Sequence, residues 1–135
     1  MSSVNVFFYG LFMDAEALRA KGFHPVNARM ASVAGMALRI GRRATLIPDP
    51  AKSAHGFVIG LSHPEIDALY AEPSVADYRP EALIARLADG SLIPALCFNL
   101  PPSGEVAEPN PEYAAKLREV ASRLGLPAAH VASIQ

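Results

Sequence analysis

Hydrophobic and polar positions along this chain follow two periods, one typical of strands and one of helices. Val4–Tyr9 is rich in β-branched and aromatic residues, which predicts a first strand. Met13–Lys21 is predicted to form a short helix that Gly22 closes. Val26–Ile40 is mostly apolar and alternates weakly, so we expect a long strand with a bulge or bend at Gly35.

The next stretch carries many turn residues. Gly41-Arg42-Arg43 predicts a turn, and Ala44–Ile47 a short strand. Pro48-Asp49-Pro50 through Ser53 predicts a loop, because proline removes a backbone donor. Gly56–Leu61 then predicts another strand.

A second helix has well-marked ends. Ser62 and Glu65 have the spacing of a capping box, and Pro64 stands in the first turn. The apolar stripe of this helix is Ile66, Leu69 and Tyr70, and Pro73 is expected to end it.

The last third of the chain predicts a hairpin and a long helix. Tyr78–Ala88 and Ser91–Leu100 flank Asp89-Gly90, a strong hairpin signal. A loop is expected over 101–109, and Asn110-Pro111 opens a helix that Gly125 ends. Its stripe is Tyr113, Leu117, Val120 and Leu124, and a short final turn is expected over 128–133.

The order of these elements, β-α-β-β-β-α-β-β-α, has too few helices for a doubly wound parallel sheet. Long bent strands with a hairpin favour an α+β fold: a small mixed, strongly curved β-barrel with peripheral helices. At 135 residues, of which 51% are hydrophobic, we expect residues 1–135 to form a single domain.

Composition narrows the classes of function. The net charge is −1 with both signs interspersed, and Arg42-Arg43 is too small a basic patch to support nucleic-acid binding. No run approaches the length of a membrane span, and Met1-Ser2-Ser3-Val4-Asn5 lacks the pattern of a secretory leader. We therefore expect a cytoplasmic protein with no nucleic-acid or membrane partner.

The junction Val6–Asp14 runs from an apolar strand through Gly10 into a helix. Backbone N–H groups and a positive helix end should surround one small space there, which suits a carboxylate, a phosphate or an oxyanion. Asp14 is best explained as the cap of the helix, and a cap competes with a ligand for the same N–H groups.

Two glutamates are candidate general bases. Glu72 is expected at the end of the capped helix, where the macrodipole and the flank of the apolar stripe favour a base active near neutral pH. Glu81, at the start of a predicted strand, is a second candidate. From spacing alone, a solvated glutamate is the more frequent outcome for such positions.

Other reactive residues carry weaker signals. His24, His55, His63 and His130 show no metal-ligand spacing, so no metal site is expected. Cys97 lies in a predicted strand and is expected to be a buried, inert thiol. Arg42 and Arg43 have the chemistry to hold a carboxylate, although a charged, solvated turn is the commoner case. Neither a nucleophile elbow nor a phosphate-binding glycine loop is present, so the sequence lacks the motifs of a serine hydrolase and of a nucleotide cofactor site.

Short motifs in one order along the chain share a resemblance. They are Tyr9-Gly10-Leu11-Phe12-Met13, Gly56–Leu61, Leu69-Tyr70-Ala71-Glu72 with the later Tyr78-Arg79, and the ending from Pro111-Glu112-Tyr113 to Leu124-Gly125-Leu126-Pro127. Together they resemble the gamma-glutamylcyclotransferase-like family across nearly the whole chain, and their order carries more weight than any one motif.

This resemblance implies a small mixed barrel with its site at one mouth. Members of the family cyclise a gamma-glutamyl amide to 5-oxoproline and release an amine or amino acid, without metal or cofactor. The matching residues imply Glu72 as the base that takes a proton from the attacking α-ammonium. The loop Tyr9–Phe12 (Tyr9, Gly10, Leu11 and Phe12) and Tyr78 would contact the substrate, a small molecule carrying a gamma-glutamyl group. On this interpretation the Glu72 carboxylate enters a pocket lined by that loop.

Three positions differ from the family pattern. Leu11 stands where the family has a hydroxyl residue, Leu69 stands where it has an aspartate, and Pro73 follows Glu72 where the family often has glycine. The differences at Leu11 and Leu69 favour an alternative, in which a barrel of the same fold binds a small anionic ligand without that catalysis.

Overall fold

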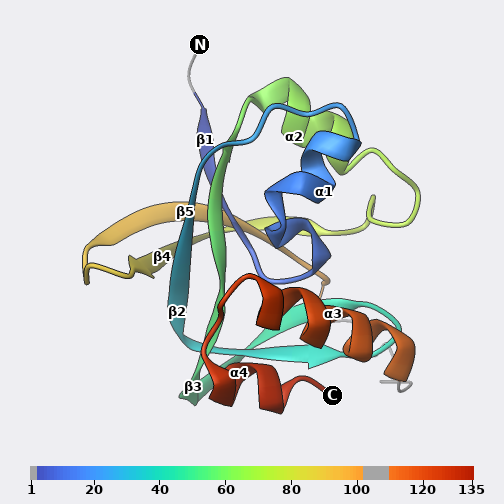
Figure 1. Ribbon diagram of the computed structural model, residues 1–135. Coiled ribbons are helices and arrows are strands. Elements are labelled where there is room, and N and C mark those ends of the chain that lie inside the picture. The colour runs from blue at the N-terminus through green and yellow to red at the C-terminus, as the bar shows by residue number, and fades with distance from the viewer. Residues whose placement is uncertain (1–2, 102–109) are drawn as a thin grey trace.

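The computed structural model describes residues 3–101 and 110–135 (Figure 1). The strands in these residues are β1 (Val4–Phe8), β2 (Val26–Ile40), β3 (Ala44–Leu61), β4 (Arg79–Leu87) and β5 (Leu92–Asn99). The helices are α1 (Ala15–Ala20), α2 (His63–Leu69), α3 (Pro111–Arg123) and α4 (Ala128–Ser133), with a 3-10 turn at Leu11–Met13. The described residues contain no helix that is both long and apolar enough to cross a membrane.

The strands close into a barrel in the order β1-β3-β2-β4-β5. β1 and β5 pair in parallel at Val6 and Leu96, whereas the other neighbouring strands are antiparallel. The mixed, strongly curved barrel with peripheral helices that the sequence predicts is therefore confirmed. Figure 1 shows the long strands β2 and β3 side by side, with α1 and α2 near one of their ends and α4 near the bend in the middle of the two strands.

The long hairpin of β2 and β3 both confirms and corrects the predicted elements. Gly35 has φ +80, and the register of β2 against β3 shifts between Ala34 and Met36, as a bulge requires. The predicted loop over 48–53 is wrong, because β3 continues through it to Leu61. Ala34 faces Ser53 and Met36 faces Pro48, so residues 49–52 form a wide irregularity opposite Gly35. Pro50 falls in that irregularity, where its missing N–H removes no ladder bond.

Side chains of the strands alternate between the barrel interior and the helices. The interior is filled mainly by small residues because few strands enclose it. Its buried members are Phe7, Tyr9, Ala31, Val33, Ala44, Leu46, Ala54, Val58, Ala85, Ala95 and Cys97. The neighbours Val6 and Phe8 on β1 point the other way and pack under helix residues such as Leu18, Leu69 and Leu117.

Helix ends largely follow the sequence signals. Asp14 accepts the Glu16 N–H at the start of α1, and Ser62 and Glu65 form the complete capping box of α2. α2 ends at Leu69, however, and Tyr70 is its C-cap, so the expectation that this helix reaches Glu72 is wrong. The residue before a proline avoids the helical region, which moves the helix end away from Pro73.

The hairpin of β4 and β5 and helix α3 are also confirmed. Gly90 has φ +89, and its N–H donates to the Leu87 carbonyl to close the β4–β5 turn. Asn110 caps α3 by accepting the Tyr113 N–H, and Gly125 follows the helix with φ +83. The predicted loop over 101–109 lies outside the described residues except for Pro101.

Candidate functional site

A cavity of about 230 Å³ lies at the end of β1 and opens to solvent. Its walls come from β1 and the loop that follows, the turn between β2 and β3, the segment after α2, β5 and α3. The lining residues with aromatic rings are Phe7, Phe8, Tyr9, Phe12, Tyr70, Tyr78, Phe98 and Tyr113. The described lining contains no carboxylate side chain.

The loop Tyr9–Phe12 is held against β3 by close backbone packing. A Cβ on Gly56 would lie 2.0 Å from the Phe8 carbonyl oxygen, so only glycine permits this approach. The end of β1 therefore has a fixed position against β3, and all four residues of the loop Tyr9–Phe12 line the cavity.

The phenol of Tyr113 occupies the space beside Gly10. Its oxygen would lie 2.8 Å from a Cβ at Gly10, and it accepts a hydrogen bond from the Leu11 N–H. Burial raises the pKa of Tyr113, while this hydrogen bond acts in the opposite direction. The space predicted for an anion beside Gly10 thus holds a neutral hydroxyl group from α3.

Tyr70 contributes a second hydroxyl group to the cavity. Its ring stacks on Phe98 with centroids 3.9 Å apart and planes inclined by 14°. Burial raises the pKa of Tyr70 above its ordinary value, and no described residue forms a hydrogen bond with its hydroxyl. The hydroxyl therefore stays protonated and is available to donate to a ligand.

The remaining tyrosine hydroxyls are used to hold the walls together. Tyr9 donates to the Phe98 carbonyl at 2.7 Å, and Tyr78 donates to the Ala44 carbonyl at 2.5 Å. The Thr45 hydroxyl also contacts the Tyr9 phenol and accepts the Leu100 N–H at 2.9 Å. These bonds fix β1, β3 and β5 around one end of the barrel.

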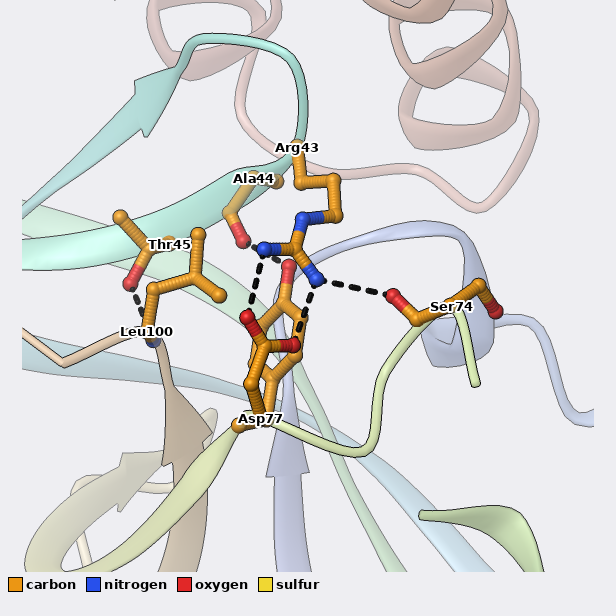
Figure 2. Close-up of polar contacts among 7 residues, drawn as sticks. Arg43, Ala44, Thr45, Ser74, Asp77 and Leu100 are labelled. Atoms are coloured by element: carbon orange, nitrogen blue, oxygen red, sulfur yellow. Dashed lines mark hydrogen bonds and ion pairs between the residues drawn. The ribbon is translucent and has the colours of Figure 1, made fainter. Parts of the chain in front are cut away.

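Arg43 fastens the segment after α2 to the turn between β2 and β3 (Figure 2). It donates to both Asp77 carboxylate oxygens, at 2.7 and 2.8 Å, and to the Ser74 carbonyl at 2.9 Å. These hydrogen bonds from Arg43 hold the pKa of Asp77 below its ordinary value. Arg43 lines the cavity, so its positive charge stands at the cavity edge but is largely balanced by Asp77.

Glu72 lies in the turn after α2 and is not among the residues that line the cavity. Its carboxylate accepts from the Lys21 ammonium at 2.7 Å. That ammonium lies 5.6 Å from the ring centroid of Phe12, which does line the cavity. Glu72 and Lys21 are therefore a half-exposed pair beside the cavity wall, and the predicted entry of Glu72 into the pocket is not what the structure has.

Glu81 and Cys97 belong to a different network. Glu81 accepts from the Asn99 side-chain Nδ2 at 3.0 Å, and the Asn99 Oδ1 accepts the Leu46 N–H at 3.2 Å. Burial raises the pKa of Cys97 to about 12, in keeping with the predicted inert thiol. Neither Glu81 nor Cys97 lines the cavity.

The histidines lie away from this site. His55 on β3 and His130 on α4 face each other with ring centroids 5.0 Å apart, beside a separate surface cavity. No group of three or more potential metal-ligating side chains occurs within residues 3–101 and 110–135.

The structure thus brings together Tyr9, Gly10, Leu11, Phe12 and Tyr78, and leaves Glu72 outside the cavity. The sequence analysis missed Tyr70 and Tyr113, because both stand at helical stripe positions that predict packing. The available signal was chemical: a tyrosine in an apolar stripe carries a hydroxyl that must find a partner or water.

Solved structures with the same fold are numerous at low sequence identity. An uncharacterised protein from Homo sapiens aligns with a TM-score of 0.80 and 18% identity, over 100% of this chain and 89% of its own. A protein named gamma-glutamyl cyclotransferase aligns with a TM-score of 0.80 and 19% identity, over 98% and 88% of the two chains. An AIG2-like protein from Mus musculus aligns with a TM-score of 0.59 and 14% identity, over 94% and 86%. The sequence matches no known protein-family profile and no curated protein.

Proposed function

We propose that this chain, which has the fold of gamma-glutamyl cyclotransferase, binds a small molecule in the aromatic cavity through a carboxylate or carbonyl group of that molecule. The observation that carries the proposal is the chemistry of the lining. Its described side chains offer donors and apolar surface, and none is a carboxylate. A cavity of this kind is the usual form of a small-molecule site.

The free donors of the cavity support an acceptor on the ligand. The Tyr70 hydroxyl has no described partner, and Tyr113 receives the Leu11 N–H while its own proton is not donated to a described residue. A carboxylate or carbonyl oxygen would satisfy these donors, and the Arg43 guanidinium at the edge would favour an anion over a cation.

Calorimetric titration of small carboxylates into the protein tests this proposal. Removing the hydroxyl with Tyr70→Phe should weaken binding about tenfold or more, because a hydrogen bond to a charged group contributes about 1.5–3 kcal/mol. The control is Arg86→Gln, on the exposed face of β4 and outside the cavity lining, which should leave the affinity unchanged. Equal affinities of wild type and Tyr70→Phe would contradict the proposal that the cavity binds a carboxylate or carbonyl group of the ligand through this hydroxyl.

A second candidate function is cyclisation of a gamma-glutamyl amide to 5-oxoproline. It is supported by the fold shared with gamma-glutamyl cyclotransferase and by the ion pair of Glu72 with Lys21, whose ammonium lies 5.6 Å from the ring centroid of the wall residue Phe12. In this reaction the α-amine attacks the γ-carbonyl carbon, the new C–N bond closes the lactam ring, and the original amide C–N bond breaks. Glu72 would take the proton of the α-ammonium and return one to the leaving amine.

Cyclisation would require the ion pair between Glu72 and Lys21 to break. Glu72 already holds one ammonium group, that of Lys21, so the substrate's α-ammonium would have to replace it. The Glu72 side chain would also have to reorient to bring its carboxylate into the cavity. These requirements rank cyclisation below ligand binding.

The assay for cyclisation is 5-oxoproline release from a panel of gamma-glutamyl amines and dipeptides. A general base contributes about 10²–10⁴-fold to a rate, so Glu72→Gln should lower kcat by at least about 10²-fold. Lys21→Met, which removes only the competing ammonium, should retain activity. Turnover that survives Glu72→Gln would exclude Glu72 as the base, and a lack of release from every substrate would exclude the reaction while leaving the binding proposal intact.

A further inference from the structure

The aromatic residues of this chain are concentrated at one place. The sequence has 4 Tyr, 6 Phe and no Trp, and every tyrosine lines the same cavity. Of the phenylalanines, Phe7, Phe8, Phe12 and Phe98 line it as well. These residues come from four separate parts of the chain, between β1 and α3, so the fold and not local sequence gathers them.

The rings hold one another in position. Tyr70 stacks on Phe98, and Tyr78 lies 6.3 Å from Tyr70 with the planes inclined by 46°. Phe12 likewise meets Phe8 edge to face at 6.4 Å and 81°. The walls are thus preorganised, with both ring faces and ring edges available in a fixed arrangement.

The size of the cavity limits the ligand. An apolar protein cavity of about 150 Å³ holds one benzene molecule. A volume of about 230 Å³ therefore accepts one six-membered ring with a side chain of about three or four heavy atoms. A gamma-glutamyl dipeptide is larger than this and would extend through the mouth.

The charges of the lining limit the ligand further. With no carboxylate in the described lining, the ammonium of an amino acid would be buried without a counter-ion, which is costly. A carboxylate instead meets the Tyr70 hydroxyl and the side of the cavity that carries Arg43. Asp77 balances much of the Arg43 charge, so the phenols contribute more to recognition than an ion pair does.

From these observations we propose that the ligand of the cavity is an aryl carboxylate: one aromatic ring that bears a short acid side chain and no amine. This inference rests on the proposed function and names the ligand class of the same site. The ring packs among the aromatic walls, and the carboxylate accepts hydrogen bonds from the phenol hydroxyls and faces the mouth.

Four probes of about the same size test the proposal by calorimetric titration into the full chain. They are phenylacetate, cyclohexylacetate, phenylacetamide and 2-phenylethylamine. Ring–ring contacts beyond simple burial should make phenylacetate bind about three- to tenfold tighter than cyclohexylacetate. Phenylacetamide should bind more weakly than phenylacetate, and 2-phenylethylamine should show no saturable binding.

The variants separate recognition from stability. Tyr70→Phe keeps the ring and removes the hydroxyl, so the preference for phenylacetate over phenylacetamide should shrink while the preference for an aromatic ring remains. Phe98→Leu should lower the preference for an aromatic ring, with circular dichroism confirming that the variant is folded. Arg86→Gln, on the exposed face of β4 away from the cavity, should behave as wild type.

Each outcome bears on a different statement. Equal affinity for phenylacetate and cyclohexylacetate would overturn the aryl preference and leave carboxylate binding in place. Tightest binding of 2-phenylethylamine would overturn both the carboxylate and the proposed function, since it would show that the rings bind a cation. Absence of binding by all four probes would overturn the aryl carboxylate, and a failed titration with non-aromatic carboxylates as well would overturn the proposed function.

Discussion

At the scale of single residues, two glycines permit close contacts that a side chain would block. Gly56 has no Cβ where the Phe8 backbone crosses it, and Gly10 has none where the Tyr113 hydroxyl lies. The sequence shows both glycines, but neither contact follows from the neighbouring residues. Gly56 looks like an ordinary strand residue until β1 is placed beside it.

We predict that Gly56→Ala strongly destabilises the protein. The new Cβ would lie 2.0 Å from the Phe8 oxygen, which is backbone and cannot rotate away. Overpacking of this kind costs about 1–3 kcal/mol or more, measured as the free energy of unfolding in urea. Gly60→Ala is the matched control on the same strand: its near contacts are side-chain atoms of the exposed Val26, at 2.8 Å, and of Ser3, at 3.1 and 3.2 Å, and none is backbone. Similar losses for the two variants would contradict the prediction.

At the scale of secondary-structure elements, the local sequence determines where the helices begin and end, but it does not determine which other elements they contact. Asp14 caps α1 as its sequence position predicts, yet its other carboxylate oxygen binds Arg123 on α3 at 2.7 Å. Helix α2 ends earlier than the sequence analysis expected, for a local reason, the proline at 73. This earlier end leaves Tyr70 in the cavity and Glu72 beside Lys21.

Helix α4 packs on the barrel through an imidazole pair, which predicts a pH dependence. Burial lowers the pKa of His130 to about 4, the neighbouring His55 adds to this effect, and burial also lowers the pKa of His55. The unfolded chain, with ordinary pKa values near 6.5, therefore binds more protons than the folded chain between about pH 4 and 6.5. The contribution of this pair to stability is fully present above about pH 6.5 and is lost as the pH falls through that window.

Urea unfolding at pH 7.0 and pH 5.0 measures this effect. The difference in the free energy of unfolding between the two pH values should shrink in His130→Gln, because that variant has no imidazole to protonate on α4. His63→Gln is the control, since His63 is exposed on α2. An unchanged difference in His130→Gln would show that another group causes the pH dependence.

At the scale of the whole molecule, the strand pairings that close the barrel differ widely in length. β2 pairs with β3 along most of its length, whereas β2 and β4 pair only at Ala31–Leu87 and Ser32–Arg86. β1 and β5 pair only at Val6–Leu96. The β2–β4 ladder lies away from the residues that line the cavity, whereas β1 and β5, which are joined by a single pair, both contribute to the cavity walls.

We predict that the barrel opens locally between β2 and β4 before it unfolds. Amide protons protected by the Ala31–Leu87 and Ser32–Arg86 pairs should exchange with a lower opening free energy than those between β1 and β3, such as at Phe7 and Val58. Hydrogen exchange followed by NMR measures both sets in one sample. The same opening free energy for both would mean that the barrel opens only by global unfolding.

Much of the fold follows from the sequence, because its determinants are local. The alternation of β2, the bulge at Gly35, the capping box at Ser62 and the stop at Gly125 each depend on residues within a few positions of one another. The predicted loop over 48–53 failed for a nonlocal reason: β3 stays a strand there because β2 lies alongside on both sides of the irregularity.

The candidate site also has one part that the sequence predicts and another that only the tertiary structure decides. The sequence by itself predicted a place for a small ligand at the junction Val6–Asp14, since a strand, a glycine and a helix start are adjacent in the chain. Only the tertiary structure decided that Tyr70 and Tyr113 meet the loop Tyr9–Phe12 and that Glu72 pairs with Lys21, 51 residues away. Local patterns fix which residues share an element, but barrel closure decides which elements share a cavity, and the chemistry of the site depends on that second step.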